Sequence, residues 1–254
     1  MDDWFAALAA GNRLPDAAQQ ELRERGFVVV PGPVPRGQLP TLARAYDAAV
    51  ASAAPEDIGG GRTTTRVHDF VNRGPAFDAL YVHPPLLATC CRFVGQPFRL
   101  SALHARAVRP HAPAQELHVD YERDGGGWPM VGFILMVDEF RPDNGATRFV
   151  PGSHGSPAAP PGLPADRTAR HPDEVLATGP AGSVIVYSGS VWHGHSANST
   201  GEQRRSLQGA YIRRHAPSGM DLPARMRPET LARIGPLAKY VLAVGPDTAP
   251  DCGQ

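Results

Sequence analysis

Two side chains that commonly bind metals, those of His118 and Asp120, are separated by a single residue. The segment from Leu117 to Tyr121 is predicted to be a β-strand, in which alternate side chains share a face, so the imidazole and the carboxylate would project together. Such a pair supplies two thirds of the two-His-one-carboxylate set that holds non-haem Fe(II) in oxygenases and leaves one side of the metal open. Alone the pair is weak evidence, because polar residues on a solvated strand face give the same pattern.

The third metal ligand has two candidates in a short predicted strand, residues 191–195. His193 and His195 point to the same face of that strand, so alternation does not separate them. A surface histidine is the alternative interpretation for either residue, and it must hold for one of them. A metal site therefore predicts that one of the two histidines approaches His118 and Asp120 in the folded chain.

A possible site for an organic co-substrate lies eleven residues after His193, where Arg204 begins a predicted strand. Arg204 and Ser206 share one face of this strand, and Arg205 points the other way. An oxygenase of this type needs an electron source, commonly 2-oxoglutarate, whose far carboxylate binds a bidentate arginine and often a hydroxyl. Arg204 and Ser206 supply both groups. Without the metal-binding pair upstream, surface arginines would be the better interpretation.

The composition is that of an ordinary globular protein. Hydrophobic residues make up 42% of the 254-residue chain, enough for a sizeable core, and the formal net charge is zero. Without a basic excess we expect no nucleic-acid partner, and without a long apolar run we expect no membrane span. The start of the sequence lacks a basic segment followed by an apolar one, so a cytoplasmic protein is expected, as a monomer or homodimer.

Apolar spacing predicts a helical N-terminal third followed by many short strands. In the strand expected over 98–109, Leu100, Ala102, His104 and Arg106 should share one face. Helices are expected at about 15–25, 35–53, 75–81 and 84–94, a strand or ordered loop at 63–70, and strands at 27–30, 98–109, 117–121, 131–137, 147–150, 175–178, 182–187, 191–195 and 204–213.

This order of elements predicts a mainly β protein with flanking α-helices. The expected architecture is a double-stranded β-helix, a cupin-like jelly roll with helices packed on one sheet. We expect a single domain over residues 1–254, with the jelly-roll core at about 98–214 and one C-terminal helix from about Glu229 to Tyr240.

Three motifs in order resemble the phytanoyl-CoA dioxygenase family of Fe(II)/2-oxoglutarate-dependent oxygenases. The resemblance runs from about Glu21 to Arg214, nearly the whole chain. The motifs are Leu-His-Val-Asp at 117–120, Asp-Asn-Gly-Ala-Thr-Arg-Phe-Val-Pro-Gly-Ser-His at 143–154 and Trp-His-Gly-His-Ser-Ala-Asn at 192–198 with Arg204 after it; Gly-Phe-Val-Val-Val-Pro-Gly at 26–32 matches as well.

The resemblance implies particular roles for these residues. It selects His193 over His195 as the third iron ligand and assigns 2-oxoglutarate to Arg204. It also implies that Gln115 and Thr147 help to hold the co-substrate. The implied reaction uses Fe(II), 2-oxoglutarate and O2 to oxidise a C–H bond. Halogenases of this fold seat chloride in place of the carboxylate ligand, so the carboxylate at position 120 argues against halogenation.

The substrate is expected to be a small, partly polar secondary metabolite, and the expected outcome is hydroxylation. Arginine and lysine are not clustered as a CoA phosphate would require. The aromatic candidates could stack on a substrate ring, but each could equally belong to the core. Candidate pocket residues are Tyr121, Trp128, Trp192, Arg66, His104 and Tyr211.

Other functions remain open on the same residues. Epimerisation, cyclisation or desaturation would use the same cofactors and pocket. A non-catalytic jelly-roll metal-binding protein, or a cupin-type isomerase or hydrolase with another divalent metal, would keep the histidines without needing Arg204. The presence of both Arg204 and Ser206 disfavours these last two interpretations.

Overall fold

The computed structural model describes residues 3–245; residues 1–2 and 246–254, part of the expected single domain, lie outside the described chain. Seven strands form an antiparallel sheet in the order β1-β8-β5-β10-β4-β3-β2, and three form a second sheet in the order β7-β6-β9. The strands are β1 (Phe27–Pro31), β2 (Ile58–Gly60), β3 (Thr64–Val67), β4 (Phe98–Val108), β5 (Met130–Met136), β6 (Thr147–Phe149), β7 (Val175–Ala177), β8 (Ser183–Ser188), β9 (His193–His195) and β10 (Arg204–Arg213).

Strand β5, near the centre of the large sheet, is buried on both faces, as its uninterrupted apolar sequence predicts. Val131, Phe133 and Leu135 belong to one apolar cluster, whereas Met130 and Ile134 belong to another. Successive strand side chains point to opposite faces, so these clusters are the layers on the two sides of the sheet. The large sheet thus separates a helix-facing core from a core between the two sheets.

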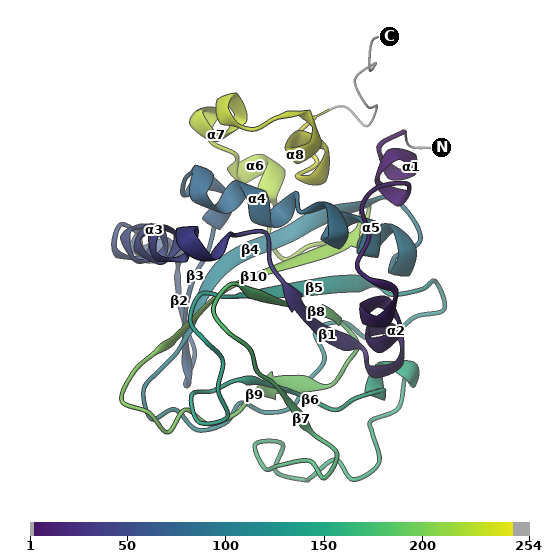
Figure 1. Cartoon of the computed structure of the whole chain (residues 1–254), viewed down its shortest axis with the longest axis vertical. Coiled ribbons are helices and arrows are strands. Elements are labelled where there is room, and N and C mark those ends of the chain that lie inside the picture. Colours follow the sequence, from purple (N-terminus) through teal and green to yellow (C-terminus); the bar gives the residue numbers. More distant parts are fainter. Residues whose placement is uncertain (1–2, 246–254) are drawn as a thin grey trace.

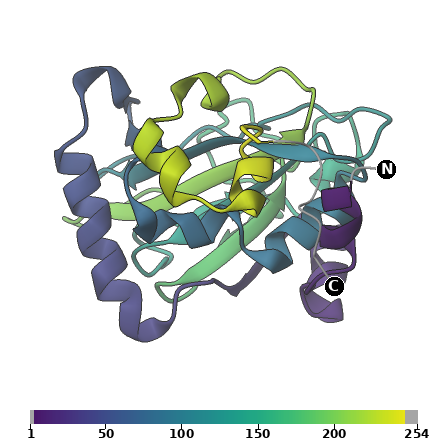
Figure 2. The same ribbon diagram turned by 90° about the horizontal axis from the view of Figure 1, so that it is seen from above.

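Helices cover one face of the large sheet, and the three-stranded sheet lies on the other side (Figure 1). Seen from above, the yellow C-terminal helices spread over the sheet and α3 follows one margin (Figure 2). Within residues 3–245, no helix is long and apolar enough to cross a bilayer. The helices are α1 (Asp3–Ala9), α2 (Asp16–Arg25), α3 (Leu39–Ala51), α4 (Asp78–Tyr81), α5 (Pro84–Phe93), α6 (Leu222–Arg225), α7 (Pro228–Arg233) and α8 (Pro236–Val241).

The mainly β jelly roll with helices on one sheet is confirmed, but two boundaries were wrong. The large sheet begins before residue 98, because β1, β2 and β3 from the N-terminal third complete its two edges. The single C-terminal helix is instead two short helices, α7 and α8, interrupted at Gly235, which is extended. Pro236 explains the interruption, since proline disfavours helical backbone in the residue before it and lacks an N–H.

A register shift in β4 changes which side chains face the second sheet. Ala102 pairs with Ala210, but Tyr211 pairs with Leu100, so Ser101 is an extra residue on β4. This bulge reverses the alternation beyond Ala102. Leu100 therefore belongs to the helix-facing core, and the prediction that it shares a face with Ala102 was wrong.

Candidate metal centre

The predicted strand from Leu117 to Tyr121 is an irregular extended segment with one isolated bridge, between His118 and His193 of β9. The two residues of the bridge exchange backbone hydrogen bonds of 3.0 and 2.9 Å. The neighbouring N–H of Leu117 donates instead to the carbonyl of Arg167, in the loop between β6 and β7. Away from the bridge, the N–H of Asp120 donates to the carbonyl of Gly189, outside β9, and the N–H of Gln115 donates to the carbonyl of His195, out of register with the bridge. The prediction of a regular strand was therefore wrong.

His118, Asp120 and His193 converge, each offering one ligand atom within 4.8 Å of the others. Nε2 of His118 is 3.8 Å from Oδ1 of Asp120, and Nε2 of His193 is 3.6 Å from Oδ2. Two imidazole nitrogens and a carboxylate oxygen grouped in this way form the donor set typical of non-haem Fe(II). The fold therefore brings the three predicted ligands together.

The tautomers of both histidines suit metal binding. Nδ1 of His118 lies 2.9 Å from the carbonyl oxygen of Glu116, and Nδ1 of His193 lies 2.9 Å from that of Val191. A carbonyl oxygen only accepts, so each Nδ1 carries the proton and each Nε2 keeps a lone pair for a metal. Burial, and then the ring of His193, lower the pKa of His118 to about 4, so this imidazole is neutral at neutral pH.

Tyr187 of β8 orients the carboxylate ligand by donating a hydrogen bond of 2.8 Å to Oδ2 of Asp120. Gly132 makes this possible, because a Cβ there would lie 2.3 Å from the Tyr187 ring. Burial acts to raise the pKa of Asp120, but His193, His118 and the tyrosine hydroxyl outweigh it, and the pKa is lowered. The carboxylate is therefore held ionised and in a defined orientation.

His195 is also buried, but its ring is engaged elsewhere. Its Nε2 lies 2.8 Å from the hydroxyl of Thr63, and its Nδ1 lies 2.8 Å from the carbonyl oxygen of Ser196. Nδ1 therefore donates, and Nε2 accepts from the hydroxyl, so neither nitrogen is left for a metal. The geometry favours His193, as the family resemblance implies, although His195 is not the surface histidine that the alternative supposed.

Arg204 is buried beside the metal ligands, with Cζ 3.9 Å from the centre of the Phe140 ring. Its Nη2 donates to the carbonyl oxygen of Gly145 at 2.8 Å, whereas Nε and Nη1 have no hydrogen-bond partner in the described chain. Burial, and then the charge of Arg106, lower the pKa of Arg204 to about 9, so it stays protonated at neutral pH. A buried cation with unused donors is suited to binding a carboxylate.

Arg204 and the three converging side chains line one cavity of about 230 Å³ between the sheets. Four further predicted residues line it: Arg66, His104, Tyr121 and Thr147. A more open hollow of about 480 Å³ shares Arg66 and His118 with the cavity and adjoins it on the side of the β2–β3 hairpin. Burial, followed by the charges of Arg66 and Arg106, lowers the pKa of His104 to about 3, so this histidine is neutral.

Arg106 lines the cavity too, but it was not among the predicted site residues. Its Nη2 donates to Oε1 of Gln115 at 2.5 Å and its Nη1 to Oε1 of Gln208 at 3.4 Å. Gln115 is thus bonded to a residue of the cavity lining but does not line this cavity itself. The signal for Arg106 was available, since it lies two residues after His104 on the same predicted strand face.

The structure removes two tryptophans from the predicted pocket. Trp128 stacks on Phe93 of α5, with ring centroids 4.4 Å apart, and packs against the helix-facing core. Trp192 precedes the ligand His193 and packs under Arg167, whose Cζ is 5.2 Å from its ring centre. Neither lines the cavity described above. Trp192 points away because adjacent residues of an extended chain face opposite sides, and Trp128 because it packs against α5.

Tyr211 and Ser206 are not part of the cavity lining either. Tyr211 is on the helix-covered face of β10, and its hydroxyl donates to the carbonyl of Tyr81 at 3.0 Å. Ser206 shares the cavity-side face of β10 with Arg204, but its hydroxyl donates to the carbonyl of Arg106 at 3.1 Å and lies outside the cavity lining. The contact of Ser206 with the co-substrate therefore stays a prediction, since its hydroxyl is bonded to a backbone oxygen here.

Comparison with known proteins adds the following. The family model described as phytanoyl-CoA dioxygenase (PhyH) matches residues 22–206. The multifunctional dioxygenase prhA of Penicillium brasilianum is 30% identical over 230 residues, which cover 83% of this chain and 75% of that protein.

Two solved structures share the fold at lower identity. The non-haem α-ketoglutarate-dependent carbocyclase SnoK of nogalamycin biosynthesis has a TM-score of 0.63 at 19% identity, covering 85% of this chain and 92% of that one. The epimerase SnoN, in complex with Fe3+, α-ketoglutarate and nogalamycin RO, has a TM-score of 0.64 at 22% identity, covering 85% and 88%.

Proposed function

The chain belongs to the phytanoyl-CoA dioxygenase family, and we propose that it is a non-haem Fe(II)/2-oxoglutarate-dependent dioxygenase that hydroxylates a C–H bond of a small secondary metabolite. The predicted family is thereby confirmed. One observation carries the proposal: the cavity that holds three convergent metal-ligand atoms also holds a buried arginine with unused donors. Metal binding alone would account for the first feature but not for the second.

Each cavity residue has a task in this proposal. His118, Asp120 and His193 would hold Fe(II), and Arg204 would hold the far carboxylate of 2-oxoglutarate. Thr147, in the cavity lining, and Gln115, bonded to Arg106, would contribute polar contacts to the co-substrate. When bound, iron and 2-oxoglutarate supply the oxidising power for O2-dependent attack on a C–H bond.

The residues around this centre control orientation and water. The Tyr187 hydroxyl keeps the Asp120 carboxylate turned toward the histidines, so the donor set is arranged before the metal arrives. Met130 and Ile134 give the cavity lining an apolar part, which would disfavour water beside the reacting atoms. Arg66, His104 and Tyr121 line the part of the cavity that would contact the substrate.

A different outcome on the same centre is the second candidate. The solved neighbours SnoK and SnoN are described as a carbocyclase and an epimerase, and both share the fold of this chain. Cyclisation or epimerisation would use the same metal ligands and the same arginine. The outcome then depends on how the substrate lies against Tyr121, His104 and Arg66, and product analysis separates it from hydroxylation.

The proposal is tested with metal, co-substrate and oxygen separately. Anaerobic addition of Fe(II) and then 2-oxoglutarate to the protein should produce a weak visible charge-transfer band. Admission of air with candidate small metabolites should then yield succinate and oxidised product. Absence of both the band and succinate would overturn the proposal in favour of a non-catalytic metal-binding protein. Arg205→Met, altered on the opposite face of β10, is the control that should retain the band.

A further inference from the structure

The two metal ligands His118 and Asp120 lie on a segment with little regular backbone support. Its backbone bonds include the bridge to His193, one from the N–H of Gln115 to β9, and one from the N–H of Asp120 to Gly189. The segment also passes directly over Gly194 of β9. A Cβ on Gly194 would lie 3.2 Å from the carbonyl oxygen of Gln115 and 3.1 Å from that of the next residue. The segment therefore lies against a position without a side chain. The N–H groups of Gln115 and Asp120 are bonded to β9 and Gly189, while the carbonyl oxygen of Gln115 is free to accept a bond from another element.

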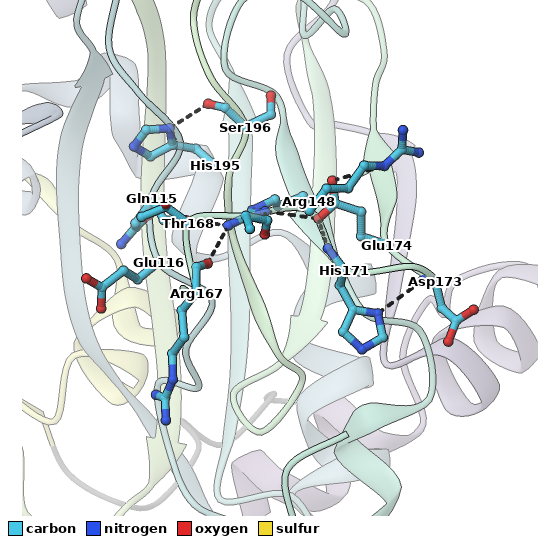
Figure 3. A network of polar contacts seen from close by, with 12 residues as sticks. Gln115, Glu116, Arg148, Arg167, Thr168, His171, Asp173, Glu174, His195 and Ser196 are labelled. Carbon is cyan, nitrogen blue, oxygen red and sulfur yellow. Dashed lines mark hydrogen bonds and ion pairs between the residues drawn. The ribbon is translucent and has the colours of Figure 1, made fainter. Parts of the chain in front are cut away.

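Arg148 of β6 supplies such a contact. It is the register partner of Gly194 across the two strands, and its side chain is buried. Its Nη2 donates to the carbonyl oxygen of Gln115 at 2.6 Å and to that of Arg167 at 2.8 Å. Figure 3 shows Arg148 in the middle of this network, between the ligand segment and residues 167–174.

The same guanidinium also binds the loop between β6 and β7. Its Nη1 donates to the carbonyl oxygen of Ala169 at 2.8 Å and to Oε2 of Glu174 at 3.0 Å (Figure 3). Between residues 150 and 174 the only regular element is one 3-10 turn, at 153–155. Long loops without regular structure inside a compact fold are commonly functional. Arg148 thus joins this loop to the segment that carries two metal ligands.

The chemistry of the contact requires arginine. Four acceptors, one from the ligand segment and three from the β6–β7 loop, are bonded to one planar guanidinium, which presents its donors in a fixed arrangement. A lysine has three donors at a single atom and cannot reach all four. Loss of the guanidinium would take the side-chain donor from the carbonyl oxygens of Gln115 and Ala169, so the ligand segment and the loop would both relax. The Glu174 carboxylate would keep only the N–H of His171 and the more distant Arg170.

We propose that Arg148 is a positioning residue for the metal centre. By bonding to the Gln115 carbonyl, it fixes the positions of His118 and Asp120, three and five residues later. Because it also bonds to the β6–β7 loop, those positions depend on the loop being ordered. The inference rests on the proposed function, because it assumes that these residues bind a metal. Arg148 itself is not among the residues that line the cavity.

Cobalt titration tests the proposal without turnover, since Co(II) absorption reports both affinity and coordination geometry. Arg148→Met should weaken Co(II) binding by roughly 10- to 100-fold, the range found when residues that orient metal ligands are removed, and should alter the spectrum. Arg148→Lys, which keeps a charge beside Glu174, should fall between this variant and the native protein. Glu174→Gln, which keeps the shape of the pair, provides a second test if Arg148→Met does not fold.

The matched control is Arg233→Met, in the helical layer. Arg233 also donates to a carboxylate, that of Asp78, and to a backbone carbonyl, that of Val71. Its loss should lower the melting temperature but leave Co(II) affinity and spectrum unchanged. Equal Co(II) affinity and spectra for native, Arg148→Met and Arg148→Lys proteins would overturn the inference. Failure of the native protein to bind Co(II) would instead count against the proposed function.

Limited proteolysis supplies an independent measurement. The Arg170 side chain is 80% exposed and lies next to the residues bound by Arg148. Trypsin should cleave after Arg170 faster in Arg148→Met than in the native protein, because the loop opens more often. Arg233→Met should not change that rate. An unchanged cleavage rate in Arg148→Met would contradict the proposed link between the guanidinium and the loop.

Discussion

One face of the seven-stranded sheet packs against helices, and the other faces the three-stranded sheet across the cavity. The helix-covered face is closed by apolar side chains such as Phe133 and Leu207. In the helical layer, Arg233 is paired, with Nε 2.8 Å from Asp78 Oδ2. On the cavity face, Arg106 and Arg204 are buried, donate to amide and carbonyl oxygens, and keep nitrogens without a partner in the described chain.

The two faces of the sheet thus differ in function: side chains on the helix-covered face stabilise the fold, whereas those on the cavity face keep polar groups available to a ligand. Apolar burial and paired charges lower the free energy of the folded state. A buried guanidinium with unused donors raises it, unless a ligand supplies the missing acceptors. Substitutions on the two faces should therefore change different quantities, and paired variants on neighbouring positions make the contrast measurable.

Removal of the carboxylate ligand should have the largest effect. Asp120→Ala takes away one of the three donors, so Fe(II) or Co(II) binding should be lost at ordinary metal concentrations. Isothermal titration with Co(II) measures this loss. His195→Ala is the control, and it should keep the metal because both ring nitrogens of His195 are bonded to the protein. Retention of tight Co(II) binding by Asp120→Ala would show that the site is elsewhere.

Phe133→Ala should have the largest effect on stability. Phe133 is 1% exposed in the helix-facing core, and truncation of such a side chain costs about 3–5 kcal/mol of unfolding free energy. Urea denaturation measures the change. At temperatures where the variant is folded, its Co(II) affinity should match that of the native protein. A large loss of metal affinity in the folded variant would mean that the two faces are not independent.

Arg204→Met should weaken 2-oxoglutarate binding by about 2–5 kcal/mol, because a desolvated carboxylate would lose its charged partner. Calorimetry on the Co(II)-loaded protein measures the affinity. Arg205→Met, one residue away on the helix side, removes a guanidinium paired with Asp138 and Asp47. It should lower stability and spare the 2-oxoglutarate affinity. If Arg205→Met weakened 2-oxoglutarate binding and Arg204→Met did not, the co-substrate would bind on the helix-covered face of β10, and the proposed site would be wrong.

Tyr187→Phe should weaken metal binding by roughly 10-fold, since the carboxylate ligand loses the hydrogen bond that orients it. Tyr211→Phe removes a hydroxyl bonded to the carbonyl of Tyr81 on the opposite face. That control should cost stability without changing Co(II) affinity. Equal Co(II) affinities for the two variants would show that the Tyr187 hydroxyl does not orient the carboxylate ligand.

The smallest expected effect is a change in acid stability at His104. The folded-state pKa is lowered to about 3 from an ordinary value of 6.5, so the unfolded chain takes up a proton at higher pH than the folded chain. The stability contributed is therefore present above pH 6.5 and is lost as the pH falls toward 3. In metal-free protein, His104→Gln should show a shallower fall in unfolding free energy between roughly pH 7 and pH 5. Parallel pH profiles would contradict this.

Regular periodicity made much of the fold predictable. The continuous apolar run of β5 gave its burial on both faces correctly, because a strand without polar side chains has no face suited to solvent. The bulge at Ser101 could not be predicted in this way, since an extra residue changes the face of Leu100 without changing residue types. Aromatic residues such as Trp128 gave no indication of whether they faced the cavity or the core, because an aromatic side chain suits both places.

Residue types and order along the chain were sufficient to name His118, Asp120 and Arg204 as candidate site residues, because donor chemistry and motif spacing are local properties. The spacing by itself left His193 and His195 equivalent, since they share a strand face; the contact between His195 and Thr63 separates them in three dimensions. Tertiary structure alone revealed that Arg106 meets Gln115 and that Arg148 holds the ligand segment. Such contacts join residues from separate strands and loops, and their partners are set by packing, which no local pattern records.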